Sequence, residues 1–596
     1  MLTRTLCLCL LATAAASFAQ TAATPQSITV TTTVEPLPLD AADRSVTVLD
    51  PHSQPLLLNN PIDLLRQDAS LNLQARGGNG VQTDLSIRGA TFEQSLILLN
   101  GLRINDPETG HLNLDLPIPF DAIDRIDVLH GSGSTFYGSD ALAGAVNLIT
   151  SQPTLTSLTA STGFGNYNSL EHHLRAALRT HALSEQLTAS RDTSDGFLPD
   201  RNYSSNAIAA ETWLTLRPGT TDILLAASDR PYGANLFYGP YDSWERTKGW
   251  FASIQQQLGP STAASFGYRR HSDLFVLFLD NPTYYRNNHI VSSYESALRR
   301  ADTFGPNTTL SYGLEADGDT IHSSNLGHHA RNQGAGYANL SLRALRRFSL
   351  SLGAREEILS GGTSVFSPSL AAAYALTNSL RLRASAGHGF RLPTYLDLYY
   401  ADPATIGNPN LKPESSWSYE SGLDWNPGGR FALSATAFRL QESNTIDYSK
   451  YNPAQPWQAN NVPSFRFTGA EATLHLRLTN NQQLQLSYTA THAAPPPTGL
   501  ISEYAFNYAT QNALLLYTAQ PFPQLILTTQ LNIVQKTTQT AYPLWNLSLA
   551  RNHGHLRPYL RLLNLSNTGY QEIPGVPLQG RTIMGGAELN WSPTHH

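Results

Sequence analysis

The sequence predicts an all-β membrane protein, in which a transmembrane β-barrel follows a small N-terminal α+β domain. Segments of about ten residues that alternate between apolar and polar side chains recur from residue 153 to residue 596, as strands do when one face meets lipid and the other faces a lumen. Charged residues make up only 14% of the chain, whereas about a quarter is usual in soluble proteins. No stretch beyond the N-terminus is apolar over the ~18 residues that a spanning helix requires.

Residues 1–19 have the organisation of a secretory signal peptide. Arg4 supplies the positive charge, an apolar core follows, and Ala19 ends a small-x-small cleavage site. Both cysteines, Cys7 and Cys9, lie inside this segment. We therefore expect a mature chain without cysteine, which excludes disulfides, thiol catalysis and cysteine-based metal sites.

Residues 20–44 form a polar leader whose composition cannot bury a core. One β-branched run inside it is suited to adding an edge strand to a partner's sheet, because main-chain hydrogen bonds supply most of the affinity in that mode of binding. The run comprises Ile28, Thr29, Val30, Thr31, Thr32, Thr33 and Val34. A disordered leader with a β-rich composition is the alternative, and several registers remain open.

Residues 45–152 contain short apolar strands broken by glycines and tight turns, which is typical of a small globular domain. Asn100-Gly101 lies between two apolar runs and predicts a two-residue hairpin, because both residues tolerate positive φ. Pro61 is expected at the first position of a short helix that extends to Gln67. At Gly89, we expect an added side chain to crowd a neighbouring backbone.

Residues 153–596 carry the alternation of a spanning barrel. Leu380, Leu382 and Ala384 are expected to face lipid, with Arg381 and Arg383 facing a wet lumen. Only a closed barrel can cross a membrane with strands, because an open edge would leave backbone groups unpaired in hydrocarbon.

Four segments of the small domain occur in a recognisable order: Ile87-Arg88-Gly89, the Asn100-Gly101 hairpin, residues 123–129 and residues 137–150. Together they resemble the plug domain of TonB-dependent outer-membrane receptors. The signature positions are Arg88, Gly89, Asn100, Gly101, Arg125, Gly138 and Gly144. Residues 390–394 with 408–414, and residues 564–582, are similar to barrel motifs of the same family. The sequence departs from the family mainly in the leader and in residues 592–596.

The resemblance implies a barrel of about 22 strands at residues 153–596, occluded by a plug at residues 45–152. It also implies that residues 28–34 are a TonB box, which pairs with a TonB-type energy-transducing protein. The chain would be a monomer in the outer membrane of a Gram-negative bacterium, in contact with its lipid, with the plug and N-terminus towards the periplasm.

The function that the resemblance implies is energy-coupled import of a scarce small solute. Cobalamin is the first expectation, since the plug and the Asn408–Glu414 region look closest to cobalamin receptors, and a ferric siderophore is the next. A saccharide or peptide receptor of the same architecture, and a passive or differently gated channel, remain alternatives. A surface enzyme or adhesin would need a further domain, for which the chain has no room.

The chain carries no pattern of a catalytic site, because it lacks a G-x-S-x-G elbow, an H-E-x-x-H motif and a thiol in the mature part. We therefore expect a protein that is not an enzyme and has no cofactor. The net charge of −6 argues against nucleic-acid binding. Asp192, Asp195 and Asp200 lie close enough in sequence to hold a loop-bound calcium ion, although a solvated loop is the favoured interpretation.

Solute contacts are expected from the long outer loops and from the outer apex of the plug. Rings that lie among glycines and prolines offer a large contact area at low entropic cost. An aromatic girdle at the membrane interface is the alternative for these rings. The candidates are Asp106, Glu108 and His111 on the plug, and Tyr232, Phe237, Tyr238, Tyr241, Trp244, Tyr284, Tyr285, Tyr399 and Tyr400 on the barrel.

Overall fold

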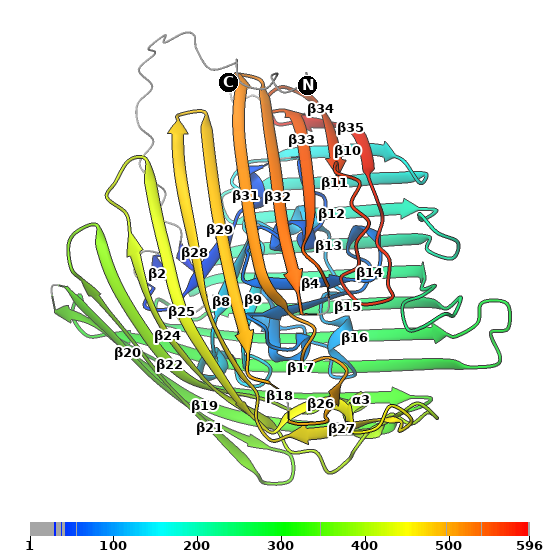
Figure 1. Cartoon of the computed structure of the whole chain (residues 1–596). Helices are drawn as coiled ribbons and strands as arrows, with labels where there is room; N and C mark the ends of the chain where they lie inside the picture. Colours follow the sequence, from blue (N-terminus) through cyan, green and yellow to red (C-terminus); the bar gives the residue numbers. More distant parts are fainter. Residues whose placement is uncertain are drawn as a thin grey trace, which may run out of the picture.

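The computed structural model describes residues 29–30, 37–38, 42–54, 56–345, 347–495, 497–537 and 539–593. They form a closed barrel of 22 antiparallel strands with a small domain, the plug, inside its lumen (Figure 1). The predicted fold class is thereby confirmed. Within the described ranges, none of the helices combines the length and the apolar character that a membrane crossing needs.

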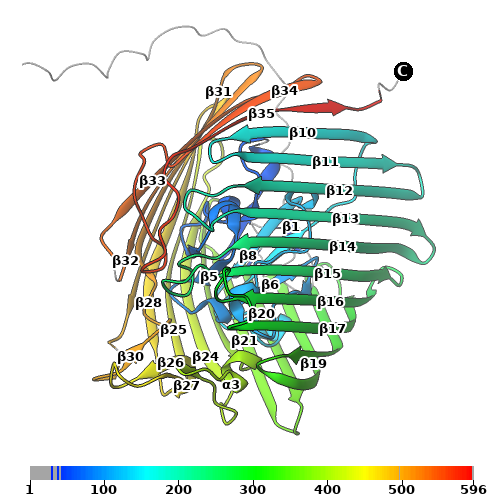
Figure 2. The same cartoon turned by 90° about the vertical axis from the view of Figure 1, so that its right-hand side faces the viewer.

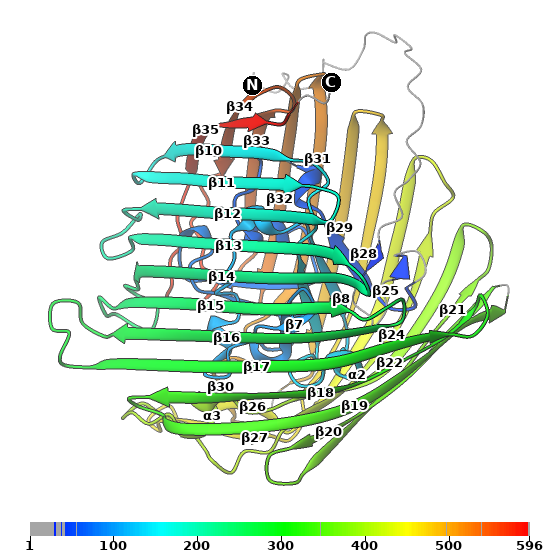
Figure 3. The same ribbon diagram turned by 180° about the vertical axis from the view of Figure 1, so that it is seen from behind.

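The barrel is a meander in which each strand pairs with the next. It closes where β35 (Thr582–Trp591) pairs with β10 (Ser157–Gly165), side by side in Figure 2. Closure leaves no strand edge unpaired. Figure 3 shows β10 to β20 as one continuous wall. The other barrel strands are β11 (Ser169–Arg179), β12 (Leu183–Ser194), β13 (Tyr203–Leu216), β14 (Gly219–Gly233), β15 (Trp244–Gln257), β16 (Thr262–Val276), β17 (Arg286–Thr303), β18 (Thr308–Ser323), β19 (Gly327–Leu345), β20 (Phe348–Leu359), β21 (Ser364–Ala375), β22 (Leu380–Arg391), β24 (Glu414–Trp425), β25 (Phe431–Ser443), β28 (Arg466–Thr479), β29 (Gln482–Ala493), β31 (Ala509–Phe522), β32 (Leu525–Lys536), β33 (Tyr542–Arg551) and β34 (Leu556–Leu563).

The barrel wall follows the period-two pattern of the sequence. On β22, Leu382 is exposed on the outer face while Arg383 is buried on the inner face. On β14, Leu225 is exposed, and its neighbours Leu224 and Ala226 are buried. The inner face is thus polar in many places. The alternation alone had suggested that this face meets water, but the plug covers it.

The plug contains a five-stranded sheet in the order β3 (Val46–Leu49), β8 (Arg125–His130), β9 (Gly144–Ile149), β6 (Ser95–Leu99) and β7 (Leu102–Arg103). A separate pair joins β4 (Leu71–Ala75) to β5 (Thr83–Ile87), and the short helices are α1 (Pro61–Leu65) and α2 (Ser134–Tyr137). The apolar core lies mostly within this domain, and its most buried members include Leu64, Ile87, Leu99, Ile126, Val128, Leu142 and Val146.

Helix α1 starts where the sequence predicts. Pro61 occupies its first turn, and the side chain of Asn60 caps it by accepting a hydrogen bond from the backbone N–H of Asp63 at 2.8 Å. Proline lacks an N–H that would otherwise be unsatisfied at this position. The helix ends at Leu65, two residues before the predicted end.

The predicted hairpin is also confirmed. Asn100 and Gly101 have φ values of 52° and 79°, and they connect β6 to β7 with Leu99 opposite Leu102. Two positive φ values are what a type I′ turn requires.

At Gly89, two residues after the end of β5, the structure corrects one expectation. Its φ is +91°, and an added Cβ would lie 2.9 Å from side-chain atoms of both Phe467 and Thr491. The crowding therefore comes from side chains of the barrel wall and not from a neighbouring backbone. Glycine is therefore favoured at this point of close contact between plug and barrel.

The connections at the two ends of the barrel differ in length. Turns at one end have two to five residues, whereas two connections at the other end, residues 392–413 and 444–465, have 22 each. Outer-membrane barrels have short periplasmic turns and longer outer loops, so we name these the inner and outer ends. At the outer end, α3 (Tyr395–Tyr399) lies beside a small sheet of loop strands (Figure 1), namely β23 (Thr405–Ile406), β27 (Trp457–Val462), β26 (Thr445–Lys450) and β30 (Ile501–Ser502).

Ahead of the plug, β1 (Thr29–Val30) pairs with β2 (Leu37–Pro38). Thr29 and Val30 are therefore the two described residues of the proposed TonB box. The remaining residues of the box and the whole signal peptide lie outside the described residues, so both stay predictions.

Replacing Gly89 with valine should loosen the plug while the barrel stays closed. A β-branched residue in this left-handed backbone conformation costs about 1–3 kcal/mol, and its side chain would also meet Phe467 and Thr491. Cells with this variant should become sensitive to large polar antibiotics that the parent excludes, with unchanged abundance and heat-modifiable migration. Gly259→Val is the matched control, because Gly259 has a φ of +84° in open space in an inner turn. Equal sensitivity of the two variants would contradict the prediction.

Candidate functional site

Arg88 is one of the buried charges that the plug presents to the barrel wall. It forms ion pairs with Glu420 on β24 and Glu471 on β28, and its guanidinium lies 4.6 Å from the ring centre of Phe438. Only 4% of its side chain is exposed. Its φ of +54° places it in the same left-handed turn as Gly89. The plug signature thus provides a turn that aims one cation at two carboxylates of the barrel.

A second buried arginine joins three parts of the molecule. Arg391, at the outer end of β22, pairs with Glu93 of the plug at 2.5 Å, with Glu414 of β24 at 3.0 Å and with Asp397 of α3 at 3.2 Å. Burial raises the pKa of Glu93 to about 8, although Arg391 opposes the shift. The site therefore links the plug, the wall and an outer loop through one guanidinium.

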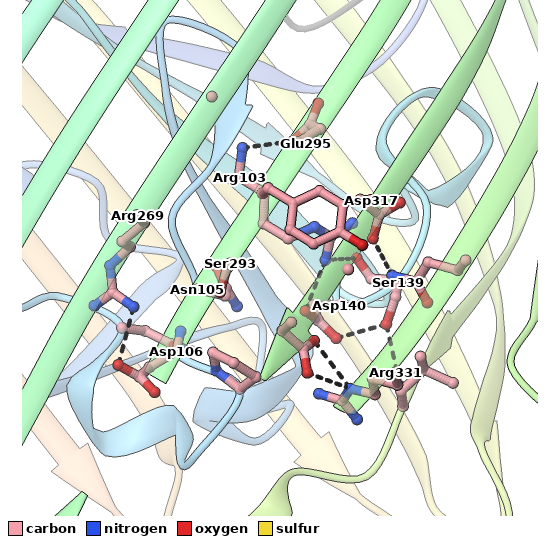
Figure 4. Close-up of a pocket in the computed structure, with 18 of the residues that line it drawn as sticks. Arg103, Asn105, Asp106, Ser139, Asp140, Arg269, Ser293, Glu295, Asp317 and Arg331 are labelled. Carbon is pink, nitrogen blue, oxygen red and sulfur yellow. Dashed lines mark hydrogen bonds and ion pairs between the residues drawn. The ribbon is translucent and has the colours of Figure 1, made fainter. Parts of the chain in front are cut away.

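A cavity of about 60 Å³ lies between the plug and strands β16 to β19 (Figure 4). On the plug side, Arg103 pairs with Asp140 at 2.8 Å, and Asp106 pairs with Arg269 of β16 at 2.9 Å. On the outer side, Arg331 pairs with Asp319 at 3.0 Å. A cavity of this volume holds a few water molecules at most. Two other cavities between plug and wall have about 80 and 110 Å³. None of the three has room for a cofactor-sized solute, and we call this arrangement the closed state.

The outer loops rest directly on the plug. The backbone N–H groups of Tyr395 and Leu396 in α3 donate to the carbonyls of Pro107 and Glu108, at 2.9 and 3.0 Å. From another loop, the ring of Tyr504 packs edge-on against a plug phenylalanine at 5.3 Å between centroids. Movement of these loops is thus mechanically connected to residues 105–113, which we name the apical loop of the plug.

The three plug residues expected at the outer mouth are turned inward. Asp106 is paired with Arg269, and Glu108 is 3% exposed. His111 stacks on Phe92 at 4.3 Å between ring centroids, and its Nδ1 lies 2.9 Å from a carboxylate oxygen of Asp84. In this closed state these residues contact the plug or the wall, so they do not line the outer surface.

The aromatic candidates on the barrel divide into buried and exposed rings. Tyr232 and Phe237 are buried against Val81 of the plug. The exposed rings are those of Tyr238, Tyr241 and Tyr284, with exposed fractions of 41%, 37% and 69%.

The remaining candidates are half-buried, and most of them contact each other or α3. The hydroxyls of Tyr285 and Tyr400 lie 3.1 Å apart. Tyr399 stacks on His329 at 3.7 Å between ring centroids. Trp244 begins β15 at the outer end. The assignment of these rings to solute binding stays a prediction.

Two aromatic residues escaped the sequence reasoning. Tyr451 is 68% exposed in the connection of residues 444–465, and Phe278 packs edge-on against both Tyr241 and Tyr284, at 5.6 and 5.3 Å. The signal was available for Tyr451, because the residues that follow it, Asn452 and Pro453, are typical of a turn.

The predicted calcium site is not formed. Asp192 is buried on the inner wall, where His173 Nε2 contacts it at 3.1 Å and Asn79 donates to it at 3.2 Å. Asp195 accepts a hydrogen bond from Asn168 at 3.1 Å. Within the described ranges, these carboxylates and that of Asp200 do not converge into a group of three. Asp192 is on β12 and faces the lumen, whereas Asp195 and Asp200 lie in the connection that follows this strand, so proximity in sequence did not bring the three together.

Comparison with known proteins decides the family. Residues 147–572 match the family model described as "TonB dependent receptor-like, beta-barrel", and residues 40–145 match "TonB-dependent Receptor Plug Domain". The chain belongs to the TonB-dependent receptor family. It is therefore an outer-membrane transporter that works with a TonB partner on a small-molecule substrate, and it is not an enzyme.

Several relatives in this family have names that indicate cargo or regulation. The chain is 26% identical over 432 residues to the "Vitamin B12 transporter BtuB" of Photobacterium profundum, with 67% of each chain covered. It is also 26% identical over 478 residues to an "Iron-regulated outer membrane virulence protein" of Vibrio cholerae, with 70% of each chain covered.

Among solved structures, the siderophore receptor PirA from Acinetobacter baumannii superimposes with a TM-score of 0.75 at 14% identity. The alignment covers 92% of this chain and 98% of the other. At this identity the likeness concerns the fold alone.

Replacing Arg88 with methionine should weaken the hold of the wall on the plug. It leaves Glu420 and Glu471 buried without their cation, and breaking a buried pair in this way costs about 3–5 kcal/mol. In planar bilayers, the urea concentration at which the purified protein begins to conduct should fall clearly.

The control is Arg300→Met, which removes an exposed pair with Asp302 that contributes little. A conductance threshold that is the same for both variants would show that the Arg88 pairs do not retain the plug.

Proposed function

We propose that this receptor imports cobalamin, with a ferric siderophore as the second candidate. The relatives named vitamin B12 transporters support the first candidate, and the iron-regulated relative supports the second at the same identity. Because sequence similarity favours neither, the choice depends on the chemistry of the outer end.

The outer end is acidic, and this observation carries the proposal. Among the described residues that are not buried, its connections hold six acidic side chains, Asp195, Asp200, Asp242, Asp280, Asp402 and Glu503, against three basic ones, Lys412, Lys450 and Arg581. An anionic ferric catecholate would be repelled by such a surface. Cobalamin has no large negative charge, and its corrin ring carries many amide groups that can hydrogen-bond to carboxylates and phenols.

The exposed rings supply the complementary apolar contact. Tyr241, Phe278 and Tyr284 form one edge-to-face cluster, in which Tyr284 is the most exposed member. Rigid rings of this kind bind a flat, extended solute at low entropic cost. This cluster is the proposed first contact for the corrin ring.

Import requires the plug to move, because the cavities of about 60, 80 and 110 Å³ between plug and wall cannot pass a solute of this size. In our proposal the TonB partner pairs with residues 28–34 and pulls the plug away from the wall. A bound solute can promote this step only if it favours the conformation in which the box is accessible.

The proposal predicts that purified protein in detergent binds cyanocobalamin, and that a Tyr241→Ala/Tyr284→Ala variant binds it about tenfold more weakly. Aromatic contacts of this kind contribute about 0.5–1.5 kcal/mol each. Isothermal titration calorimetry measures the change. Phe304→Ala is the control, because Phe304 is 60% exposed but lies in an inner turn. Binding of a ferric siderophore without binding of cyanocobalamin would replace the first candidate by the second.

Val30→Pro should uncouple binding from uptake. Proline removes one N–H donor from the proposed box and so disturbs strand pairing with the partner. Solute binding by the purified protein should be unchanged, while uptake of radiolabelled solute by cells falls to background. Val30→Thr keeps both the donor and the β-branch and should transport normally. Uptake that persists in the proline variant would move the box elsewhere in the leader.

A further inference from the structure

Glu108, Asp273 and His289 form an unusual cluster where the plug meets the wall. Each offers one ligand atom, and these atoms all lie within 4.8 Å of one another. Glu108 belongs to the apical loop of the plug, Asp273 to β16 and His289 to β17, near the outer end of both strands. Within the described ranges, this is the one group of three or more such side chains.

The cluster is buried and incompletely paired. The three residues are exposed by 3%, 6% and 4%, in the order Glu108, Asp273 and His289. Oε2 of Glu108 and Oδ1 of Asp273 have no hydrogen-bond partner among the described residues. Buried polar atoms without partners are rare, and an ion that binds them is one explanation.

The excess of carboxyl groups around the cluster also favours a bound cation. Asp106 and Glu245 add further carboxyl groups beside Glu108 and Asp273. Arg269 acts on Glu108 while it pairs with Asp106 at 2.9 Å, and Arg76 acts on Glu245. Four carboxyl groups, those of Asp106, Glu108, Glu245 and Asp273, therefore share a buried region with two arginines, and additional positive charge would stabilise them.

We propose that Glu108, Asp273 and His289 bind one divalent first-row transition cation, such as Zn²⁺, which clamps the apical loop of the plug to the barrel. One imidazole nitrogen and two carboxylate oxygens are a ligand set that suits such ions. Calcium fits less well, because it prefers six to eight oxygen ligands.

The geometry needs little adjustment for this role. A tetrahedral zinc site separates its oxygen and nitrogen ligands by about 3.3 Å, and Nδ1 of His289 already lies 3.4 Å from Oε1 of Glu108. The hydroxyl of Ser323 lies 2.8 Å from the same imidazole nitrogen, so this hydrogen bond must give way when Nδ1 binds the cation. A cation here would cross-link three elements that the sequence separates by up to 181 positions, from Glu108 to His289.

The site would hold the same apical loop that receives the hydrogen bonds from α3. The backbone carbonyl of Glu108 accepts from Leu396 at 3.0 Å, while its side chain faces Asp273 and His289. The clamp would thus fix this loop from the wall while α3 holds it from outside. The proposal does not depend on which solute is imported.

The test is a zinc titration of the chelator-treated full chain in detergent. The titration uses a His322→Gln/His328→Gln background, because these two exposed histidines, with Nδ1 atoms 2.5 Å apart, could bind zinc on the surface. Calorimetry should give one zinc per chain. Asp273→Asn, His289→Gln and Glu108→Gln should each weaken binding at least tenfold, since even outer partners of metal ligands change affinity by about 10–100-fold. X-ray absorption should show nitrogen and oxygen ligands.

His173→Gln is the matched control. His173 is also buried between the plug and the wall, but its two ring nitrogens already contact Asp121 and Asp192, at 2.6 and 3.1 Å. This variant should bind zinc as the parent does. In planar bilayers, zinc should raise the urea concentration at which the parent and the control begin to conduct, without changing it in the three ligand variants. Absence of stoichiometric zinc binding, or equal affinity in ligand and control variants, would overturn the proposal.

Discussion

The polar inner face of the barrel is the constraint on which the rest of the structure depends. A barrel that alternates apolar and polar residues must cover its inner face with water or with protein, and here the plug covers it. Charges such as Arg88 and Arg391 are consequently buried, and each meets carboxylates across the plug–barrel interface. A buried charge without a partner would be strongly unfavourable, so the plug fits the lumen in one orientation.

The same constraint makes the interface suitable for a transporter. The apolar core lies mostly within the plug, where burial stabilises the fold by roughly 25 cal/mol per Å². The contacts to the wall combine apolar packing, such as that of Val81 with Phe237, with buried ion pairs, whose attraction is offset by the desolvation of both partners. Force applied to the leader therefore acts on an interface in which part of the electrostatic attraction is cancelled by desolvation.

Local features were predictable from the sequence because they depend on neighbouring residues. The Asn100-Gly101 hairpin, the start of α1 at Pro61 and the alternation on β22 follow from backbone preferences and from the period of two, and the structure contains all three. The family motifs added the strand number and the plug. Each of these signals lies within about a dozen residues of sequence.

The partners of side chains were not predictable, because they depend on how plug and barrel meet. Tyr232 and Phe237 have the composition of a binding loop but pack against Val81. Asp106 and Glu108 follow an exposed-looking hairpin but face β16 and β17, from a plug loop more than 150 residues away in sequence. Neither hydrophobic periodicity nor a turn motif indicates contacts between segments so far apart in sequence. The sequence analysis therefore placed these residues at the outer opening of the barrel.

The position of the apical loop explains how an event at the outer surface can reach the plug. Its carbonyls at Pro107 and Glu108 accept hydrogen bonds from α3, and α3 also carries Asp397, a partner of Arg391. A solute that displaces α3 must either break these contacts or carry the apical loop with it. In both cases the contacts between plug and wall change, and a difference in contacts between two conformations is what a ligand needs in order to shift their populations. Coupling between the outer loop and the plug therefore requires no intervening residues, since α3 and the apical loop are joined directly by hydrogen bonds.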